Sequence, residues 1–229
     1  MITAAGLWRE WLSKTMNWKF LRPVPWLDTR SKFVAGAPPG GALLDLGSSD
    51  GETLRHIAEL RPDLRLYSAD LFGKPENYPA NCEFRRADFN CEKLPWPDRS
   101  MDAITCMQVI EHLDDLGNLL GEVARLLKPG GRAFFETPHS KTLHLPSAKG
   151  KFTLNFFDDS SHTRVVTMEQ LAAMLEPTGL RVTRAGISRN WLLAAAHPFF
   201  AVLPESRKKF TARVHWIGWS AYLIATKPG

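Results

Sequence analysis

A short apolar run followed by a loop of small residues, within residues 41–54 (GALLDLGSSDGETL), most constrains how this chain can fold. The apolar run, residues 42–46, is long enough for a buried strand and too short for a helix. The loop contains Gly47 and Gly51, which can adopt positive φ, and helical spacing of apolar residues begins at Leu54. A strand, a tight loop and a helix in this order are typical of the ligand-binding corner of a doubly wound α/β sheet.

The charge of this loop indicates what it can bind. The dinucleotide fingerprint needs glycine at its first, third and sixth positions, where this loop has Gly47, Ser49 and Glu52. Asp50 and Glu52 would also repel a pyrophosphate at the N-terminus of the helix, where anions otherwise bind. The loop therefore disfavours a nicotinamide cofactor. It suits a cofactor with cationic groups, such as S-adenosylmethionine, which carries an ammonium and a sulfonium.

Length and composition indicate one domain. The 229 residues, 44% hydrophobic and 23% charged, suffice for a single globular domain over residues 1–229 with a sizeable core. No apolar run approaches the roughly 18 residues of a transmembrane helix. The three cysteines are widely spaced and match no zinc or redox motif, so we expect reduced thiols and a cytoplasmic location. The net charge of +5 leaves anionic substrates, membrane surfaces and nucleic acid open as partners.

Acidic residues recur where later strands are expected to end. Residues 64–70 predict a second strand that ends at Asp70, and residues 84–89 predict a third strand that includes Asp88 and Phe89. Asp70 lies where a second-strand carboxylate contacts a ribose in such folds, the alternative being a turn or cap residue. Asp88 can accept a hydrogen bond from an adenine amino group, and Phe89 can offer an aromatic face.

The rest of the chain continues the alternation of strands and helices, which predicts a parallel sheet. The further expected strands are residues 101–107 and 131–137, and the helix between them has apolar residues spaced over 116–127.

Five motifs occur in the order and spacing of one known family. They are LLDLGSSDG (residues 43–51), Asp70, Asp88-Phe89, QVIEHL (108–113) and LLKPGGRAFFETP (126–138). Over residues 40–185 the chain resembles the class I S-adenosylmethionine-dependent methyltransferases, in particular the small-molecule branch that includes the ubiquinone- and menaquinone-pathway enzymes. The resemblance implies an α/β fold with a doubly wound, seven-stranded Rossmann-like sheet, mostly parallel with an antiparallel last strand. Residues 180–188 and 218–226 fit the family's sixth and seventh strands, and residues 168–176 fit the helix before the sixth.

The resemblance also implies a set of cofactor contacts. These are Asp45, Gly47, Ser49 and Gly51 for the methionine moiety, Asp70 for the ribose, Leu71, Asp88 and Phe89 for the adenine, and Met107 and Gln108 for the floor near the sulfonium. Ser49 departs from the family's usual glycine, and a serine fits there if its φ is negative.

The segment 139–165 is expected to be an insertion that closes over the substrate, because long loops at this edge of such a sheet often do. His162 is the first candidate for a general base, oriented by Asp158 or Asp159; the alternative is a loop histidine that orders the lid. Glu111 and His112 are further catalytic candidates, the alternative being a pair that orders the cofactor floor. His139 is a lesser candidate. A metal role for Glu111, Asp114 and the histidines is conceivable, but no ligand spacing is diagnostic, so no metal is predicted.

Two further segments are expected to flank the site. Residues 1–40 carry tryptophans that predict an amphipathic helix near 4–18, as a cap on the sheet, an aromatic lid or a lipid-contacting surface. Residues 190–215 join the apolar stretch 191–204 to a basic one. They predict a pocket wall, or a face for a lipid-linked or anionic acceptor with peripheral membrane contact.

These observations together predict an S-adenosylmethionine-dependent methyltransferase that methylates a small-molecule or lipid-linked acceptor at oxygen, by in-line displacement with a histidine base. The alternatives are a nucleic-acid or protein methyltransferase and a catalytically idle protein that binds the cofactor. Nucleic acid is disfavoured as a partner, because the fourth expected strand is followed by Met107-Gln108-Val109-Ile110 and not by an Asn-Pro-Pro-Tyr-type tetrapeptide. The identity of the acceptor and the oligomeric state remain open.

Overall fold

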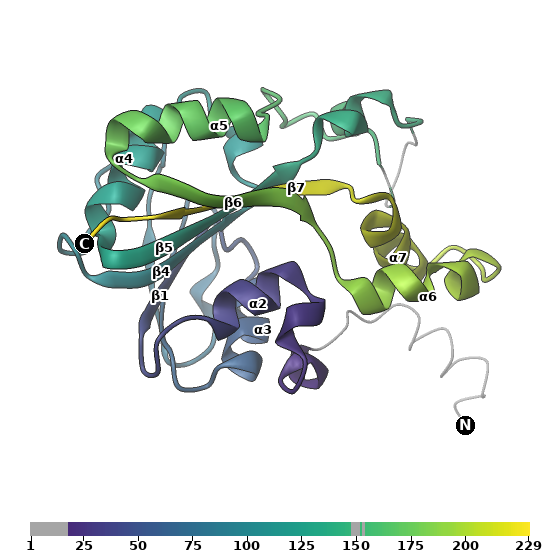
Figure 1. Ribbon diagram of the computed structural model, residues 1–229, viewed down its shortest axis with the longest axis horizontal. Coiled ribbons are helices and arrows are strands. Elements are labelled where there is room, and N and C mark those ends of the chain that lie inside the picture. The colour runs from purple at the N-terminus through teal and green to yellow at the C-terminus, as the bar shows by residue number, and fades with distance from the viewer. Residues whose placement is uncertain (1–17, 148–151, 153) are drawn as a thin grey trace.

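The computed structural model describes residues 18–147, 152 and 154–229 (Figure 1). The helix expected near residues 4–18 lies outside these residues except for Trp18, and so stays a prediction. The described chain begins with two short 3-10 helices, Trp18–Leu21 and Pro25–Leu27, followed by helix α2 (Thr29–Ala35). The buried Asp28 begins α2 by accepting a hydrogen bond from the backbone N–H of Ser31 at 2.7 Å.

Seven strands form one sheet in the order β3-β2-β1-β4-β5-β7-β6. They are β1 (Ala42–Leu46), β2 (Arg65–Asp70), β3 (Cys82–Arg86), β4 (Met101–Met107), β5 (Leu127–Pro138), β6 (Arg181–Ser188) and β7 (Ser220–Thr226). The strands β1 to β5 pair in parallel, and β7 is antiparallel to both β5 and β6. The predicted fold class is therefore confirmed.

The third strand is shorter than predicted from residues 84–89. Its last paired residue is Arg86, which lies opposite Asp70, the last residue of β2. Because β2 offers no partner beyond Asp70, the chain leaves the sheet there. Asp88 and Phe89 consequently lie in the loop between β3 and β4, and their predicted place within a strand is wrong.

Helices cover both faces of the sheet (Figure 1). The helices α2 and α3 (Glu52–Leu60) lie on one face, and α4 (Gly117–Leu126) and α5 (Met168–Leu175) lie on the other. The helices α6 (Trp191–Ala201) and α7 (Arg207–Ile217) lie beyond the end of the sheet. Successive residues of β1 point to opposite faces. Leu43 belongs to the buried cluster with Ile57 of α3, whereas Leu44 belongs to the cluster with Leu120 of α4. The continuous apolar run ALLDL is thus explained by a strand that is buried on both sides.

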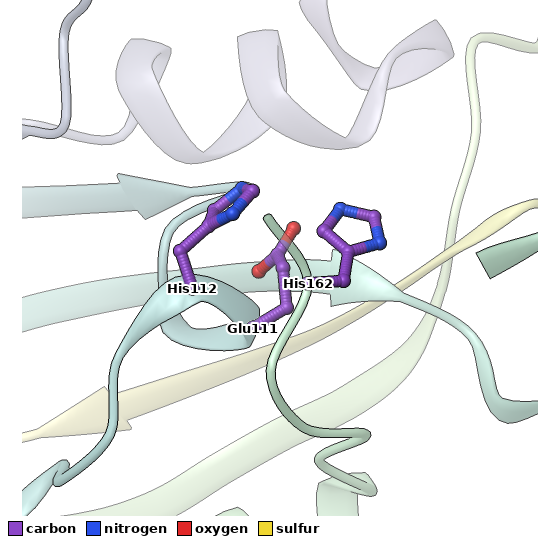
Figure 2. A group of neighbouring side chains, drawn as sticks. All are labelled: Glu111, His112 and His162. Carbon is purple, nitrogen blue, oxygen red and sulfur yellow. The ribbon is translucent and has the colours of Figure 1, made fainter. Parts of the chain in front are cut away.

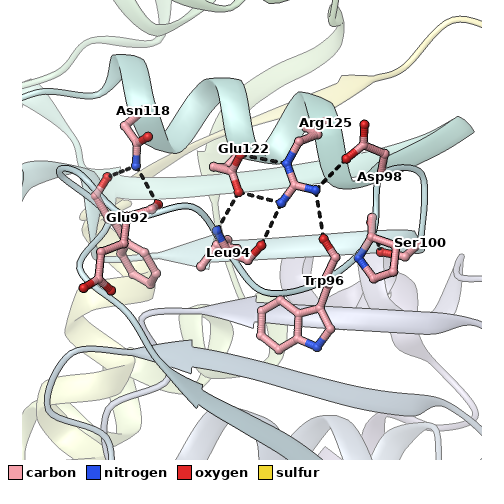
Figure 3. Close-up of polar contacts among 10 residues, drawn as sticks. Glu92, Leu94, Trp96, Asp98, Ser100, Asn118, Glu122 and Arg125 are labelled. Atoms are coloured by element: carbon pink, nitrogen blue, oxygen red, sulfur yellow. Dashed lines mark hydrogen bonds and ion pairs between the residues drawn. The ribbon is translucent and has the colours of Figure 1, made fainter.

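Helix α4 fixes the loop between β3 and β4 (Figure 3). Arg125 donates from Nη2 to the carbonyl of Leu94 at 2.9 Å, and Glu122 accepts from the backbone N–H of Leu94 at 2.7 Å. Asn118 donates to the carbonyl of Phe89 at 2.9 Å. These contacts hold a loop that has no regular structure of its own along α4, from the end of β3 to the start of β4.

Between β6 and β7 the chain forms the helices α6 and α7 in place of a direct turn (Figure 1). Asn190 caps α6 by accepting from the backbone N–H of Leu193 at 3.0 Å, and Ser206 caps α7 by accepting from that of Lys209 at 3.3 Å. Within the residues that the structure describes, no helix combines the length and the apolar composition needed to cross a membrane.

Candidate active site

The loop after β1 adopts the left-handed conformation at three positions. Gly47 has a φ of 79° and Gly51 a φ of 76°, as predicted for these two glycines. Ser49 also lies there, with a φ of 45°, so the expectation of a negative φ at this residue is wrong. The reason lies outside the loop: the Ser49 N–H donates to Asp70 Oδ2 at 2.8 Å, and the Ser49 carbonyl accepts from the Tyr78 hydroxyl at 3.0 Å.

Asp70 ends β2 with both carboxylate oxygens oriented. Oδ2 accepts from Ser49 N–H, and Oδ1 accepts from Phe72 N–H at 2.7 Å. The side chain is 8% exposed, and each oxygen keeps a second lone pair for another donor. Leu71, beside it, is half-buried, whereas Phe72 is 81% exposed. Asp70 is therefore a held carboxylate at the edge of the sheet, as the predicted ribose contact requires.

Asp45 lies deeper, within β1. Its Oδ1 accepts from the Thr105 hydroxyl of β4 at 2.6 Å, and the residue is only 2% exposed. Burial raises the pKa of Asp45 to about 7; the hydrogen bond from Thr105 and the charge of Arg30 oppose the rise, and Asp70 adds to it. A cation placed beside Asp45 would bring this pKa down.

Arg30 of α2 is a site residue that the sequence analysis missed. It donates from Nε to Glu136 Oε2 at 3.0 Å and forms a second contact, from Nη2, with Oε1 of the same carboxylate. Glu136 is fully buried in β5, and the ion pair with Arg30 keeps its pKa below the usual range although burial opposes this. The two residues lie 106 positions apart, and no local motif surrounds Arg30 that could have identified it.

Gln108 belongs to the same polar group. Its φ is 57°, and its side chain donates to Glu136 Oε1 at 3.1 Å and to Ser220 Oγ at 3.2 Å. Met107, the last residue of β4, is half-buried and packs against the cluster on the α3 side of the sheet. The two predicted floor residues thus lie at the carboxyl end of β4, Met107 as its last residue and Gln108 directly after it. The Gln108 amide is directed toward Glu136.

The predicted adenine contacts differ from each other in exposure. Asp88 is half-buried, and its Oδ1 accepts from the backbone N–H of Asn90 at 2.9 Å and from the Asn90 amide at 3.1 Å. Phe89 is 7% exposed and belongs to the hydrophobic core. Its ring therefore packs in the core, and the adenine contact of Phe89 stays a prediction. Asp88 retains an oxygen for a donor.

A cavity of about 360 Å³ adjoins Arg30 and Gln108 on the side of α7. Its polar lining comes from Arg30, the segment after β4 and the segment 155–162, and its apolar lining comes from α7 and the residue before β7. The lining residues are Arg30, Gln108, Glu111, His112, Asn155, Asp159, His162, Phe210, Val214, Trp219 and Ser220. The three predicted catalytic residues therefore share one cavity.

Figure 2 shows the Glu111 carboxylate between the imidazoles of His112 and His162. The ring centroids of the two histidines are 4.9 Å apart. A backbone contact joins the two segments: the N–H of Thr163 donates to the Glu111 carbonyl at 2.9 Å. Glu111 lies in the short helix Ile110–His112, and His162 follows the short helix Phe156–Asp158.

The hydrogen-bond partners of the two histidines define their tautomers. His162 Nδ1 lies 2.7 Å from the Phe156 carbonyl, and His112 Nδ1 lies 3.2 Å from the Ser161 carbonyl. Because a carbonyl only accepts, each Nδ1 carries the hydrogen, and each Nε2 keeps a free lone pair in the neutral ring. Asp159 Oδ2 lies 3.8 Å from His162 Nε2. His162 thus presents a basic nitrogen to the cavity.

Glu111 is fully buried, with one oxygen satisfied. Oε2 accepts from the Thr137 hydroxyl at 3.0 Å, whereas Oε1 has no hydrogen-bond partner among the described residues. Burial raises the pKa of Glu111 to about 8. One carboxylate oxygen and the two imidazoles offer ligand atoms that all lie within 4.8 Å of one another. This group could hold a metal ion, and the sequence analysis predicted none because His162 lies 50 positions after its neighbours.

The other candidates lie outside this group. Asp158 accepts from the hydroxyl of Ser147. His139 begins a short helix by accepting from the backbone N–H of Lys141 at 3.1 Å. Of the two aspartates predicted to orient His162, Asp159 is the one with a recorded contact to its ring.

Comparison with known proteins identifies the family of this chain. A family model described as a methyltransferase domain matches residues 18–185. An S-adenosylmethionine-dependent methyltransferase of Mycolicibacterium smegmatis is 38% identical over 94 residues, which cover 41% of this chain and 34% of that protein. A ubiquinone biosynthesis O-methyltransferase of Ralstonia nicotianae is 28% identical over 145 residues, which cover 62% of this chain and 59% of that protein. The chain therefore spans less than two thirds of the length of these relatives.

Among solved structures, the phosphoethanolamine N-methyltransferase 2 of Haemonchus contortus in complex with S-adenosylmethionine has a TM-score of 0.60 at 17% identity. The alignment covers 99% of this chain and 58% of that one, and at this identity it shows the fold alone.

The sheet topology and these matches define the class, the Rossmann-like S-adenosylmethionine-dependent methyltransferases. The chain belongs to the methyltransferase domain family. It is similar to ubiquinone- and menaquinone-pathway enzymes at 28–29% identity. Its cofactor is S-adenosylmethionine, as the resemblance of the motifs predicted.

Proposed function

We propose that this methyltransferase methylates a small molecule at an oxygen atom, with His162 as the general base. The observation that carries the proposal is the free Nε2 of His162 in the cavity beside Gln108. The name of the Ralstonia relative, a ubiquinone biosynthesis O-methyltransferase, supports an oxygen acceptor on a small molecule.

The residues at the carboxyl edge fit the cofactor in charge and in hydrogen bonding. We infer that Asp70 accepts from the ribose hydroxyls, because its two oxygens are oriented by backbone donors and retain lone pairs. Asp45 takes the ammonium, and the guanidinium of Arg30, between Asp45 and the cavity, takes the carboxylate. The loop from Gly47 to Gly51 follows β1 and contacts Asp70 through the Ser49 N–H. Asp88 accepts from the adenine amino group.

Bound S-adenosylmethionine supplies a methyl group on a sulfonium, which is already an activated leaving group. The chain therefore has to align the acceptor, exclude water and remove one proton. His162 Nε2 accepts the proton of the acceptor hydroxyl, while its Nδ1–H stays on the Phe156 carbonyl and fixes the ring. Asp159, 3.8 Å from Nε2, stabilises the imidazolium that forms.

The lining of the cavity supports an acceptor with an apolar body. Phe210 and Val214 of α7 and Trp219 form one side, and the polar residues form the other. Near the cavity, α6 and the residue after it expose Trp191, Phe199 and Val202 by 57%, 58% and 83%. We infer that this helix contacts the apolar part of a lipid-linked acceptor or a membrane surface.

The basic residues of α7 contribute less to such a surface than the sequence suggests. Arg207 pairs with Glu52 at 3.0 Å, and Lys209 and Arg213 pair with Glu205 at 3.0 and 3.1 Å. Because these charges are partly neutralised within the chain, the proposal favours an apolar acceptor over an anionic one.

A second role for the histidines is favoured by the geometry of Glu111, His112 and His162. Each imidazole donates its Nδ1–H to a backbone carbonyl, as metal-binding histidines do, and each directs its Nε2 lone pair elsewhere. A divalent cation there would act as a Lewis acid on the acceptor oxygen. Dialysis against EDTA separates the two roles: a base needs no added cation, whereas a metal site loses activity that Mg²⁺, Mn²⁺ or Zn²⁺ restores.

The test of the proposed base is a comparison of turnover and cofactor affinity in two variants. Transfer of a labelled methyl group to a panel of phenols and quinols identifies an acceptor. His162→Gln should then lower kcat by at least about a hundredfold, the usual contribution of a general base, with S-adenosylhomocysteine affinity unchanged. The control is His144→Gln, an exposed histidine of the same segment. Full turnover in His162→Gln, or an equal loss of cofactor affinity, would contradict the role.

A further inference from the structure

Ser49 adopts a conformation that a serine does not favour. Its φ of 45° lies in the left-handed region, which costs a residue with a Cβ free energy that glycine does not lose. The loop therefore needs a contact that compensates for the serine. The Ser49 hydroxyl is not that contact, since the hydrogen bonds of this residue run through its backbone.

The compensating contact is Tyr78, a side chain from outside the loop. Tyr78 follows the short helix Pro75–Asn77 and is 9% exposed. Its hydroxyl donates to the Ser49 carbonyl at 3.0 Å and accepts from Ser48 Oγ at 3.2 Å. One hydroxyl thus bridges two consecutive residues of the cofactor loop.

The ring of Tyr78 fits this place because two glycines leave room for it. A Cβ added to Gly51 or to Gly73 would overlap Tyr78 atoms. On a third side the ring packs edge-on against Phe84 of β3, with centroids 5.1 Å apart. The orientation of the hydroxyl is therefore fixed by packing and not only by its hydrogen bonds.

We propose that Tyr78 is a positioning residue that keeps Ser49 left-handed and thereby holds the Asp70 carboxylate in place for the cofactor. The link is the Ser49 N–H, which donates to Asp70 Oδ2 at 2.8 Å. Rotation of Ser49 to a negative φ would turn this N–H away and leave Asp70 with a single backbone donor, that of Phe72. The inference rests on the proposed role of the loop and Asp70 in cofactor binding.

The test is a double-mutant cycle on the affinity for S-adenosylhomocysteine, measured by calorimetry on the full chain. Tyr78→Phe removes only the hydroxyl and should weaken binding by roughly three- to tenfold, the range of one hydrogen bond. Ser49→Gly alone gives the reference affinity of a loop with glycine at position 49. Because glycine adopts the left-handed region without help, Tyr78→Phe should cause no further loss of affinity in the Ser49→Gly background.

The control is Tyr222→Phe, a half-buried tyrosine of β7 that stacks on Phe134 away from the loop. It should leave the affinity unchanged. Wild-type affinity in Tyr78→Phe, or a loss on Tyr78→Phe that is equally large in the Ser49→Gly background, overturns the inference, because glycine at position 49 would not suppress the loss of a general stabilising role. Absence of binding by the wild type overturns the proposed cofactor site itself, and the inference with it.

Discussion

The buried Asp45 makes cofactor binding depend on pH in a way that can be calculated. Burial raises its pKa to about 7, so near neutral pH the carboxyl group is only partly ionised. The Thr105 hydroxyl and Arg30 favour the ionised form, while Asp70 opposes it. If Asp45 receives the cofactor ammonium, only the protein with ionised Asp45 binds the cofactor well. In molecules whose Asp45 is protonated, binding must displace that proton.

The magnitude follows from the ionised fraction. With a pKa of about 7, roughly a tenth of Asp45 is ionised at pH 6 and roughly three quarters at pH 7.5. The affinity for S-adenosylhomocysteine should therefore rise about eightfold between these pH values. At pH 7, binding should release about half a proton per site, which appears as a dependence of the calorimetric heat on the ionisation enthalpy of the buffer.

The variant Asp45→Asn tests the assignment. The asparagine keeps an acceptor for Thr105 but cannot ionise. We therefore expect weaker binding of S-adenosylhomocysteine, and we expect the roughly eightfold rise in affinity between pH 6 and 7.5 to disappear. A wild-type protein whose affinity and heat are constant over this range would refute the reasoning, and so would a pH dependence that Asp45→Asn leaves intact.

Three further predictions concern stability and the loop. Arg125→Ala should lower the free energy of unfolding by about 2 kcal/mol in urea titrations, because the Leu94 and Trp96 carbonyls lose their hydrogen bonds. Arg85→Ala, which breaks an exposed ion pair, is the control and should change this free energy by less than about 1 kcal/mol. Gly47→Ala should abolish S-adenosylhomocysteine binding in calorimetry, since the φ of 79° disfavours alanine and its Cβ would overlap Val109. Burial, with Arg30 nearby, lowers the pKa of His215 from 6.5 to about 4, so the folded protein resists a proton that the unfolded chain accepts. The free energy of unfolding that this shift contributes is fully present above pH 6.5 and should fall by up to about 3 kcal/mol as the pH falls toward 4. In His215→Gln, the melting temperature should therefore depend less on pH between 6.5 and 4.

The sequence predicts well what depends on neighbours along the chain. The alternation of apolar runs and turns locates the first five strands, and the family resemblance locates the last two. The buried acids Asp45 and Asp70 stand out because each lies in or ends an apolar strand. The end of β3 is predicted wrongly because it depends on where its partner β2 stops.

Contacts between distant residues explain the rest. The conformation of Ser49 depends on Tyr78, 29 positions away, and Arg30 enters the site through Glu136, 106 positions away. His162 joins Glu111 and His112 only because the segment 154–164 folds back onto them. None of these pairs leaves a pattern in the local sequence, so only the structure reveals them.

The central claim is that the acidic carboxyl edge of the sheet holds the cofactor, and Asp70 tests it most directly. We would titrate the wild type and Asp70→Ala with S-adenosylhomocysteine, with NAD as a parallel control. The account predicts one micromolar site in the wild type, no binding of NAD, and an affinity weakened by roughly five- to a hundredfold in Asp70→Ala, since buried ribose hydroxyls would lose their acceptor. Equal affinity in the two proteins, or binding of NAD alone, would contradict it.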